Sequence, residues 1–113
     1  MRAAVGLALS IGLIAGVAGC SQDNAASDHH ATASVMASTN VWGSVASAIA
    51  GDHASVKSII ANPEQDPHSF EATPSDAAAI TDATLVVYNG GGYDHWVDDV
   101  LAGHQGVAAV DAY

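Results

Sequence analysis

The loop from Asn62 to Glu71 holds the residues best suited to chemistry. Its two prolines, Pro63 and Pro67, restrict the backbone, so that His68 stands in a stiff turn. A neutral imidazole binds zinc, manganese and related ions, and rigid presentation lowers the entropy lost on binding. A single histidine is also a common surface residue. From the residue pattern alone, both a metal ligand and a plain surface role remain open.

The other histidines give weaker signals. His29 and His30 are adjacent in a polar segment, where they are either a weak metal-capture pair or simply solvated side chains. The remaining three, which are scattered along the chain, are expected at the surface: His53, His95 and His104.

Catalytic chemistry finds little support in the sequence. The run Asn89-Gly90-Gly91-Gly92 follows an apolar stretch but lacks the Lys-Ser/Thr of a P-loop and the spacing of a dinucleotide fingerprint. A tight strand-to-helix turn explains it better. The nucleophile elbow of a Ser-His-Asp enzyme is also missing from the sequence. We therefore expect a protein that is not an enzyme.

The charge balance excludes nucleic acid as a partner. Acidic residues number 12 and basic residues 2, which gives a formal charge of −10. Binding to phosphates needs clustered Lys and Arg, whereas the basic residues here are Arg2 and Lys57 alone. An acidic surface raises the local concentration of cations, but the charge alone is also that of a soluble, self-repelling exported protein without a cation role.

The amino-terminal stretch predicts export and lipid anchoring. Met1-Arg2 precedes an apolar run from Ala3 to Ala18, which is long enough for a signal-peptide core and short for a membrane-spanning helix. The run ends in Val17-Ala18-Gly19-Cys20, which resembles the lipobox of bacterial lipoproteins. We expect residues 1–19 to be a signal peptide and Cys20 to be lipidated, with an uncleaved anchor or an ordinary signal peptide as alternatives.

The remaining chain divides into a tether and a globular part. Residues 20–33 are rich in small and polar side chains and lack periodicity, so we expect a flexible tether. Export and lipidation of Cys20 would place the protein on the extracytoplasmic face of the membrane. From residue 34 onward, short apolar runs alternate with stretches of helical spacing. The expected strands are 34–38, 54–60, 83–88 and 107–110; the expected helices begin near Thr39-Asn40, at the capping box Thr73-Pro74-Ser75-Asp76, and at Asp94.

This alternation predicts an α/β fold with a doubly wound parallel four-stranded sheet. The helix after Asn40 carries Val41, Val45, Ala48 and Ile49 at helical spacing. In such sheets ligands bind beyond the carboxyl ends of the strands. Two loops are candidates there, residues 63–70 and residues 89–93.

The globular part resembles the metal-binding subunits of zinc and manganese ABC importers. The resemblance covers residues 34 to 111, and its most specific stretch is Asp66-Pro67-His68-Ser69-Phe70-Glu71 followed by Thr73-Pro74-Ser75-Asp76. Further matches in the same order are Val35 to Ser38, Gly51-Asp52, Ala83 to Asn89, and Trp96.

That resemblance implies a function and a set of site residues. His68 corresponds to the family's first metal ligand, while Asp66, Glu71 and Tyr93 match neighbouring positions that orient the histidine or line the cleft. The implied cargo is zinc, with manganese as the alternative, and the implied partners are an ABC permease and ATPase. A metal-sequestering or adhesin lipoprotein without a transport role remains the rival.

The resemblance also implies that residues 34–113 are an incomplete amino-terminal lobe. Members of the family have two α/β lobes joined by a long helix, with the metal between the lobes. Their remaining ligands would lie beyond Tyr113, so we expect a fragment or a truncated homologue. One or two ligands do not complete a tetrahedral site, and we therefore expect weak zinc binding by this chain alone.

Overall fold

The computed structural model describes residues 32–113, and the predicted signal peptide, Cys20 and the His29-His30 pair lie outside this range. Strands and helices alternate along the chain. Two short 3-10 turns, Gly51–His53 and Pro67–Ser69, interrupt the connections. The main elements are β1 (Ala33–Thr39), α1 (Asn40–Ala50), β2 (Ala54–Ile60), α2 (Pro74–Thr81), β3 (Leu85–Tyr88), α3 (His95–Ala102) and β4 (Ala109–Asp111).

The strands form one parallel sheet in the order β2-β1-β3-β4. Val35 of β1 is paired with Val56 of β2 on one side and with Leu85 of β3 on the other. β1 and β3 are the central strands. From β1 the chain crosses to β2 at one edge of the sheet, and after β2 it returns to form β3 on the other side of β1. This confirms the predicted four-stranded parallel sheet, with strand ends shifted by one or two residues at β1, β3 and β4.

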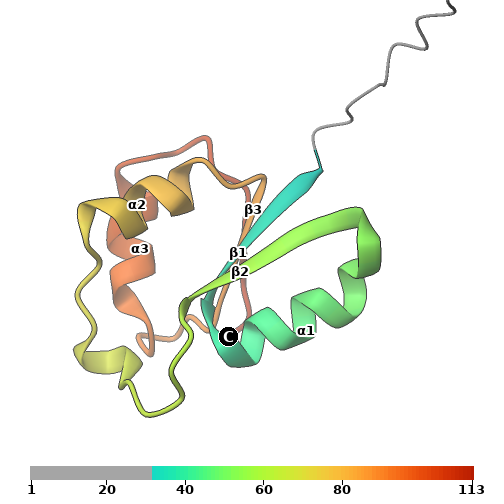
Figure 1. Ribbon diagram of the computed structural model, residues 1–113. Helices are drawn as coiled ribbons and strands as arrows, with labels where there is room; N and C mark the ends of the chain where they lie inside the picture. The colour runs from blue at the N-terminus through green and yellow to red at the C-terminus, as the bar shows by residue number, and fades with distance from the viewer. Residues whose placement is uncertain (1–31) are drawn as a thin grey trace, which may run out of the picture.

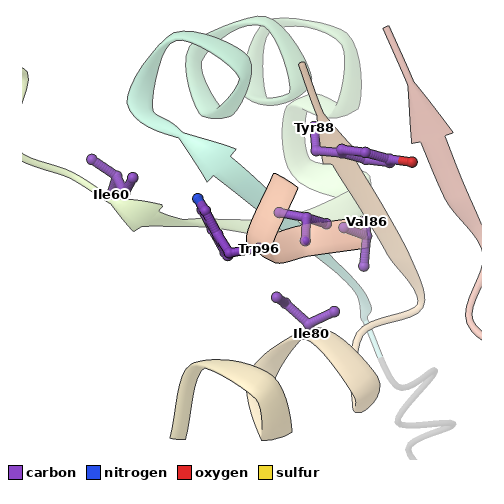
Figure 2. Packing of buried hydrophobic residues seen from close by; sticks show 6 residues of the cluster. Ile60, Ile80, Val86, Tyr88 and Trp96 are labelled. Atoms are coloured by element: carbon purple, nitrogen blue, oxygen red, sulfur yellow. The ribbon is translucent and has the colours of Figure 1, made fainter. Parts of the chain in front are cut away.

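Helices cover both faces of the sheet. α2 and α3 lie side by side on one face, and α1 lies on the other against β1 and β2 (Figure 1). The core fills the space between the sheet and the helices α2 and α3. There Ile80 of α2 points toward Val86 of β3 and Trp96 of α3 (Figure 2), and all three side chains are buried.

The start of α2 follows from its capping box. The Thr73 hydroxyl accepts a hydrogen bond from the backbone N–H of Asp76 at 3.2 Å, and the Asp76 carboxylate accepts one from the backbone N–H of Thr73 at 2.9 Å. Pro74 occupies the first helical position, where a missing N–H costs nothing. The sequence-based prediction for this helix is confirmed.

The apolar residues of α1 are largely exposed and are not buried against the sheet. Val41, Val45 and Ile49 are 64%, 43% and 82% exposed, whereas the buried residue of the helix is Gly43. A Cβ at Gly43 would collide with the Ser58 hydroxyl, so glycine permits the close approach of α1 to β2. Val45 and Ile49 instead line an apolar groove together with Val35, Leu85, Val87 and Val110. Within residues 32–113, no helix combines the length and apolarity needed to cross a bilayer.

Candidate metal-binding site

His68 lies in a tight turn that Asp66 organises. The Asp66 side chain accepts a hydrogen bond from the backbone N–H of His68 at 3.0 Å, and the Ser69 N–H donates to the Asp66 carbonyl at 3.3 Å. Pro67 starts the turn and is buried, so it also anchors the loop to the body of the protein. The imidazole itself remains exposed to solvent. The buried Pro67 and the carboxylate of Asp66 therefore hold the His68 ring in a position that solvent can reach.

The same carboxylate oxygen contacts the ring. Asp66 Oδ1 lies 3.2 Å from His68 Nδ1. The pKa of the Asp66 carboxyl is lowered from its usual value, chiefly by the backbone N–H of His68, with the imidazole adding to the effect and partial desolvation opposing it. The structure thus brings together two of the residues that the sequence singled out.

A third predicted residue reaches His68 from another loop. The ring of Tyr93 contacts the imidazole edge-on, with centroids 4.6 Å apart and planes at 77°. Tyr93 follows Gly90, Gly91 and Gly92, whose backbones all have positive φ. This conformation lets the chain turn sharply after β3 and carries Tyr93 back toward the His68 loop.

The buried Asp94 side chain holds the loop that carries Tyr93 by hydrogen bonds to the backbone of that loop. Asp94 is fully buried, and its two carboxylate oxygens accept hydrogen bonds from the backbone N–H groups of Asn89 at 2.8 Å and Gly90 at 2.9 Å. Sequence reasoning treated Asp94 as the start of a helix and missed this role. A buried acidic residue immediately after a glycine run was the available signal.

Beside the His68 turn lies a cleft of about 300 Å³, at the carboxyl ends of three strands. Each strand is followed by an asparagine on the cleft wall: Asn40 after β1, Asn62 after β2 and Asn89 after β3. The cleft also touches Pro67 and Tyr93, which are the immediate neighbours of His68. The predicted position of the ligand-binding region, beyond the carboxyl ends of the strands, thus coincides with a real hollow.

Among the asparagines of the cleft, Asn89 belongs to the predicted loop 89–93, whereas the place of Asn40 and Asn62 on the cleft wall was not predicted from the sequence. Asn89 Oδ1 accepts a hydrogen bond from the indole N–H of Trp42 at 3.3 Å, which ties the start of α1 to the end of β3. Asn62 Oδ1 accepts one from the backbone N–H of Glu64 at 3.0 Å and so shapes the loop after β2. Their shared place after a strand could have identified them.

Glu71 lies apart from the Asp66–His68–Tyr93 cluster. It lines a separate hollow with His95 and Asp99, next to the ring contact between Phe70 and Trp96. His53 and His95 are exposed, and the ring of His104 contacts the carbonyl of Val100 at 2.9 Å. In the part of the chain that the structure describes, no three His, Cys, Asp or Glu side chains converge as a metal cage. His68 itself does not line the cleft, whereas its neighbours Pro67 and Tyr93 do.

As a class, the chain is an α/β unit with a four-stranded parallel sheet and a cleft at the carboxyl ends of its strands. Residues 35–113 match the family model described as "Zinc-uptake complex component A periplasmic". The chain belongs to this family, whose members are solute-binding proteins of ABC importers and not enzymes.

Named relatives agree with this assignment. The chain is 33% identical over 102 residues to the manganese-binding lipoprotein MntA of Halalkalibacterium halodurans, covering 89% of this chain and 33% of the relative. It is 31% identical over 84 residues to the manganese ABC transporter substrate-binding lipoprotein PsaA of Streptococcus pneumoniae, covering 74% of this chain and 27% of the relative. The chain thus spans about a third of the length of these relatives.

A solved structure supports the fold. The crystal structure of Zn(II)-bound AdcA from Streptococcus pneumoniae is similar to 71% of this chain, with a TM-score of 0.60 and 26% sequence identity, and the match covers 17% of the AdcA chain.

Proposed function

We propose that residues 34–113 form the amino-terminal lobe of an extracytoplasmic solute-binding lipoprotein, which captures a divalent metal ion for an ABC importer, with His68 as its first metal ligand. The observation that carries this proposal is the placement of His68. Its ring is held by Asp66 and Tyr93 beside the cleft at the carboxyl ends of β1, β2 and β3. Family membership supplies the transport role.

Zinc is the favoured cargo, and manganese is the alternative. The family description names zinc, whereas the two relatives above are named for manganese. Imidazole is a ligand type that suits zinc, whereas carboxylate and water suit manganese, so His68 as a ligand favours zinc. Side chains from a second lobe would complete the coordination and set the final preference.

The amino-terminal residues support a location outside the cytoplasmic membrane. The lipobox-like Val17-Ala18-Gly19-Cys20 would be cut before Cys20, and acylation of the cysteine would tether the lobe through residues 20–33 to the outer side of the cytoplasmic membrane. There the lobe would deliver its metal ion to an ABC permease, which works in complex with an ATPase. The names of both relatives include the word lipoprotein, which supports the anchor.

The proposal is tested by zinc titration of the 113-residue chain and its His68→Ala variant. We expect weak binding, in the micromolar range or above, that His68→Ala reduces at least tenfold. Two controls separate this site from other histidines: His53→Ala removes an exposed ring far from the cleft, and His29→Ala/His30→Ala removes the paired histidines. Equal affinity in wild type and His68→Ala would contradict the assignment of His68. Binding that is lost only in the double variant would move the site to the tether.

A further inference from the structure

The two ring nitrogens of His68 have different surroundings. Nδ1 lies 3.2 Å from Asp66 Oδ1, whereas Nε2 has no hydrogen-bonding partner within residues 32–113. Asp66 Oδ1 also accepts the backbone N–H of His68 at 3.0 Å. An ionised carboxylate only accepts hydrogen bonds, so a neutral imidazole that contacts it must carry its proton on Nδ1. The lone pair is then on Nε2.

The ring of His68 is also restrained from a second side. Tyr93 packs against the imidazole with centroids 4.6 Å apart. Tyr93 belongs to the loop after β3, which the buried Asp94 ties to the sheet edge through the N–H groups of Asn89 and Gly90. Rotation of the imidazole would therefore break the hydrogen bond to Asp66 or push against a ring whose own loop is fixed.

We propose that Asp66 and Tyr93 are positioning residues: Asp66 holds His68 as the Nδ1–H tautomer, and Tyr93 limits rotation of the ring, so that Nε2 is the atom offered to the metal. This proposal rests on the proposed function, because it concerns the orientation of the same ligand. In water, the neutral histidine side chain favours the opposite tautomer, with the proton on Nε2. Asp66 thus keeps the donor atom unprotonated before the metal arrives.

The tautomer is measured directly by nitrogen NMR on the metal-free 113-residue chain, at a pH where His68 is neutral. We expect the Nδ1–H form in the wild type and a shift toward the Nε2–H form in Asp66→Ala. Asp66→Asn should restore the Nδ1–H form, because the amide oxygen accepts the same hydrogen bond. Asp66 is exposed, so these variants are expected to fold. An Nε2–H tautomer in the wild type, or the same tautomer in all three proteins, would overturn the role of Asp66.

Zinc affinity supplies the second readout. Loss of a group that orients a metal-binding histidine typically costs about 10- to 100-fold in metal affinity. We expect Asp66→Ala to fall in that range and Asp66→Asn to lie between it and the wild type. Tyr93→Phe keeps the ring and should weaken zinc binding less than Tyr93→Leu, which removes the ring and should weaken it severalfold. Glu64→Ala is the matched control, since it removes a carboxylate from the same loop that makes no hydrogen bond to His68.

The two readouts separate the two proposals. If His68→Ala leaves zinc binding unchanged while the tautomer of the metal-free chain follows Asp66, the proposed function fails and the positioning of the ring stands as a structural fact. If His68→Ala abolishes binding while Asp66→Ala alters neither tautomer nor affinity, His68 remains the ligand and the role of Asp66 is wrong. Equal weakening by Tyr93→Phe and Tyr93→Leu would refute the role assigned to the Tyr93 ring.

Discussion

Asp66 and His68 are joined twice through one carboxylate oxygen, which lies 3.0 Å from the backbone nitrogen and 3.2 Å from ring Nδ1 of the histidine. The first contact closes the turn that begins at Pro67. The second sets which ring nitrogen is free. Backbone conformation and ligand chemistry therefore depend on the same side chain, and a change at Asp66 affects both.

Asp94 is expected to stabilise the loop that carries Tyr93. In Asp94→Asn the amide keeps one acceptor, but its NH₂ faces one of the two N–H groups that the carboxylate now satisfies. A buried N–H left without a partner costs about 1–3 kcal/mol, so chemical denaturation should show a loss of at least about 1 kcal/mol in the free energy of unfolding. Asp99→Asn, on an exposed position of α3, is the control and should change little.

The capping box of α2 is expected to contribute measurably to stability. Thr73→Ala removes the hydroxyl that accepts from the Asp76 N–H. Loss of such a cap costs about 0.5–2 kcal/mol. Thr73→Ser keeps the hydroxyl and should retain most of the stability in urea denaturation. Equal loss in both variants would show that the Thr73 methyl group, and not its hydrogen bond, is responsible.

Tyr88 is expected to make the lobe sensitive to alkaline pH. Burial raises the pKa of its phenol to about 12, and Asp98 adds to the rise. Because the folded-state pKa lies above the unfolded value of about 10, the folded state favours the neutral phenol. Its contribution to stability is complete below about pH 10 and is lost as the pH rises toward 12.

This dependence is checked by denaturation between neutral and strongly alkaline pH. The wild type should lose stability more steeply than Tyr88→Phe over that upper range, and tyrosinate absorbance should show a late-titrating group that the variant lacks. Parallel stability profiles for the two proteins would show that Tyr88 does not control the alkaline limb.

The parts of the fold set by local sequence were predictable. The strand spacing, the α2 capping box and the loop containing His68 follow from short-range patterns and match the structure. The burial pattern of α1 was not predictable in the same way. It depends on Gly43 packing against Ser58, a contact between helix and strand that leaves Val41 and Ile49 exposed. Periodicity identifies an apolar stripe on a helix but not how much of that stripe is buried against the sheet.

The candidate site was predicted only in part for the same reason. Asp66 and His68 are two residues apart, so their contact follows from the turn. Asn40, Asn62 and Tyr93 follow three different strands, and only the folded sheet brings them to one edge. Glu71 is close to His68 in sequence, yet it lines another hollow beside α3, where Phe70 packs on Trp96.

The central claim is that Nε2 of His68 binds the cation, and zinc titration of the ¹⁵N-histidine-labelled chain tests it most directly. The account predicts that Nε2 of His68 shifts as zinc is added, with a midpoint equal to that of overall binding, while Nδ1 keeps its proton. The account would be contradicted if the nitrogens of other histidines tracked zinc binding and both nitrogens of His68 stayed unchanged to saturation.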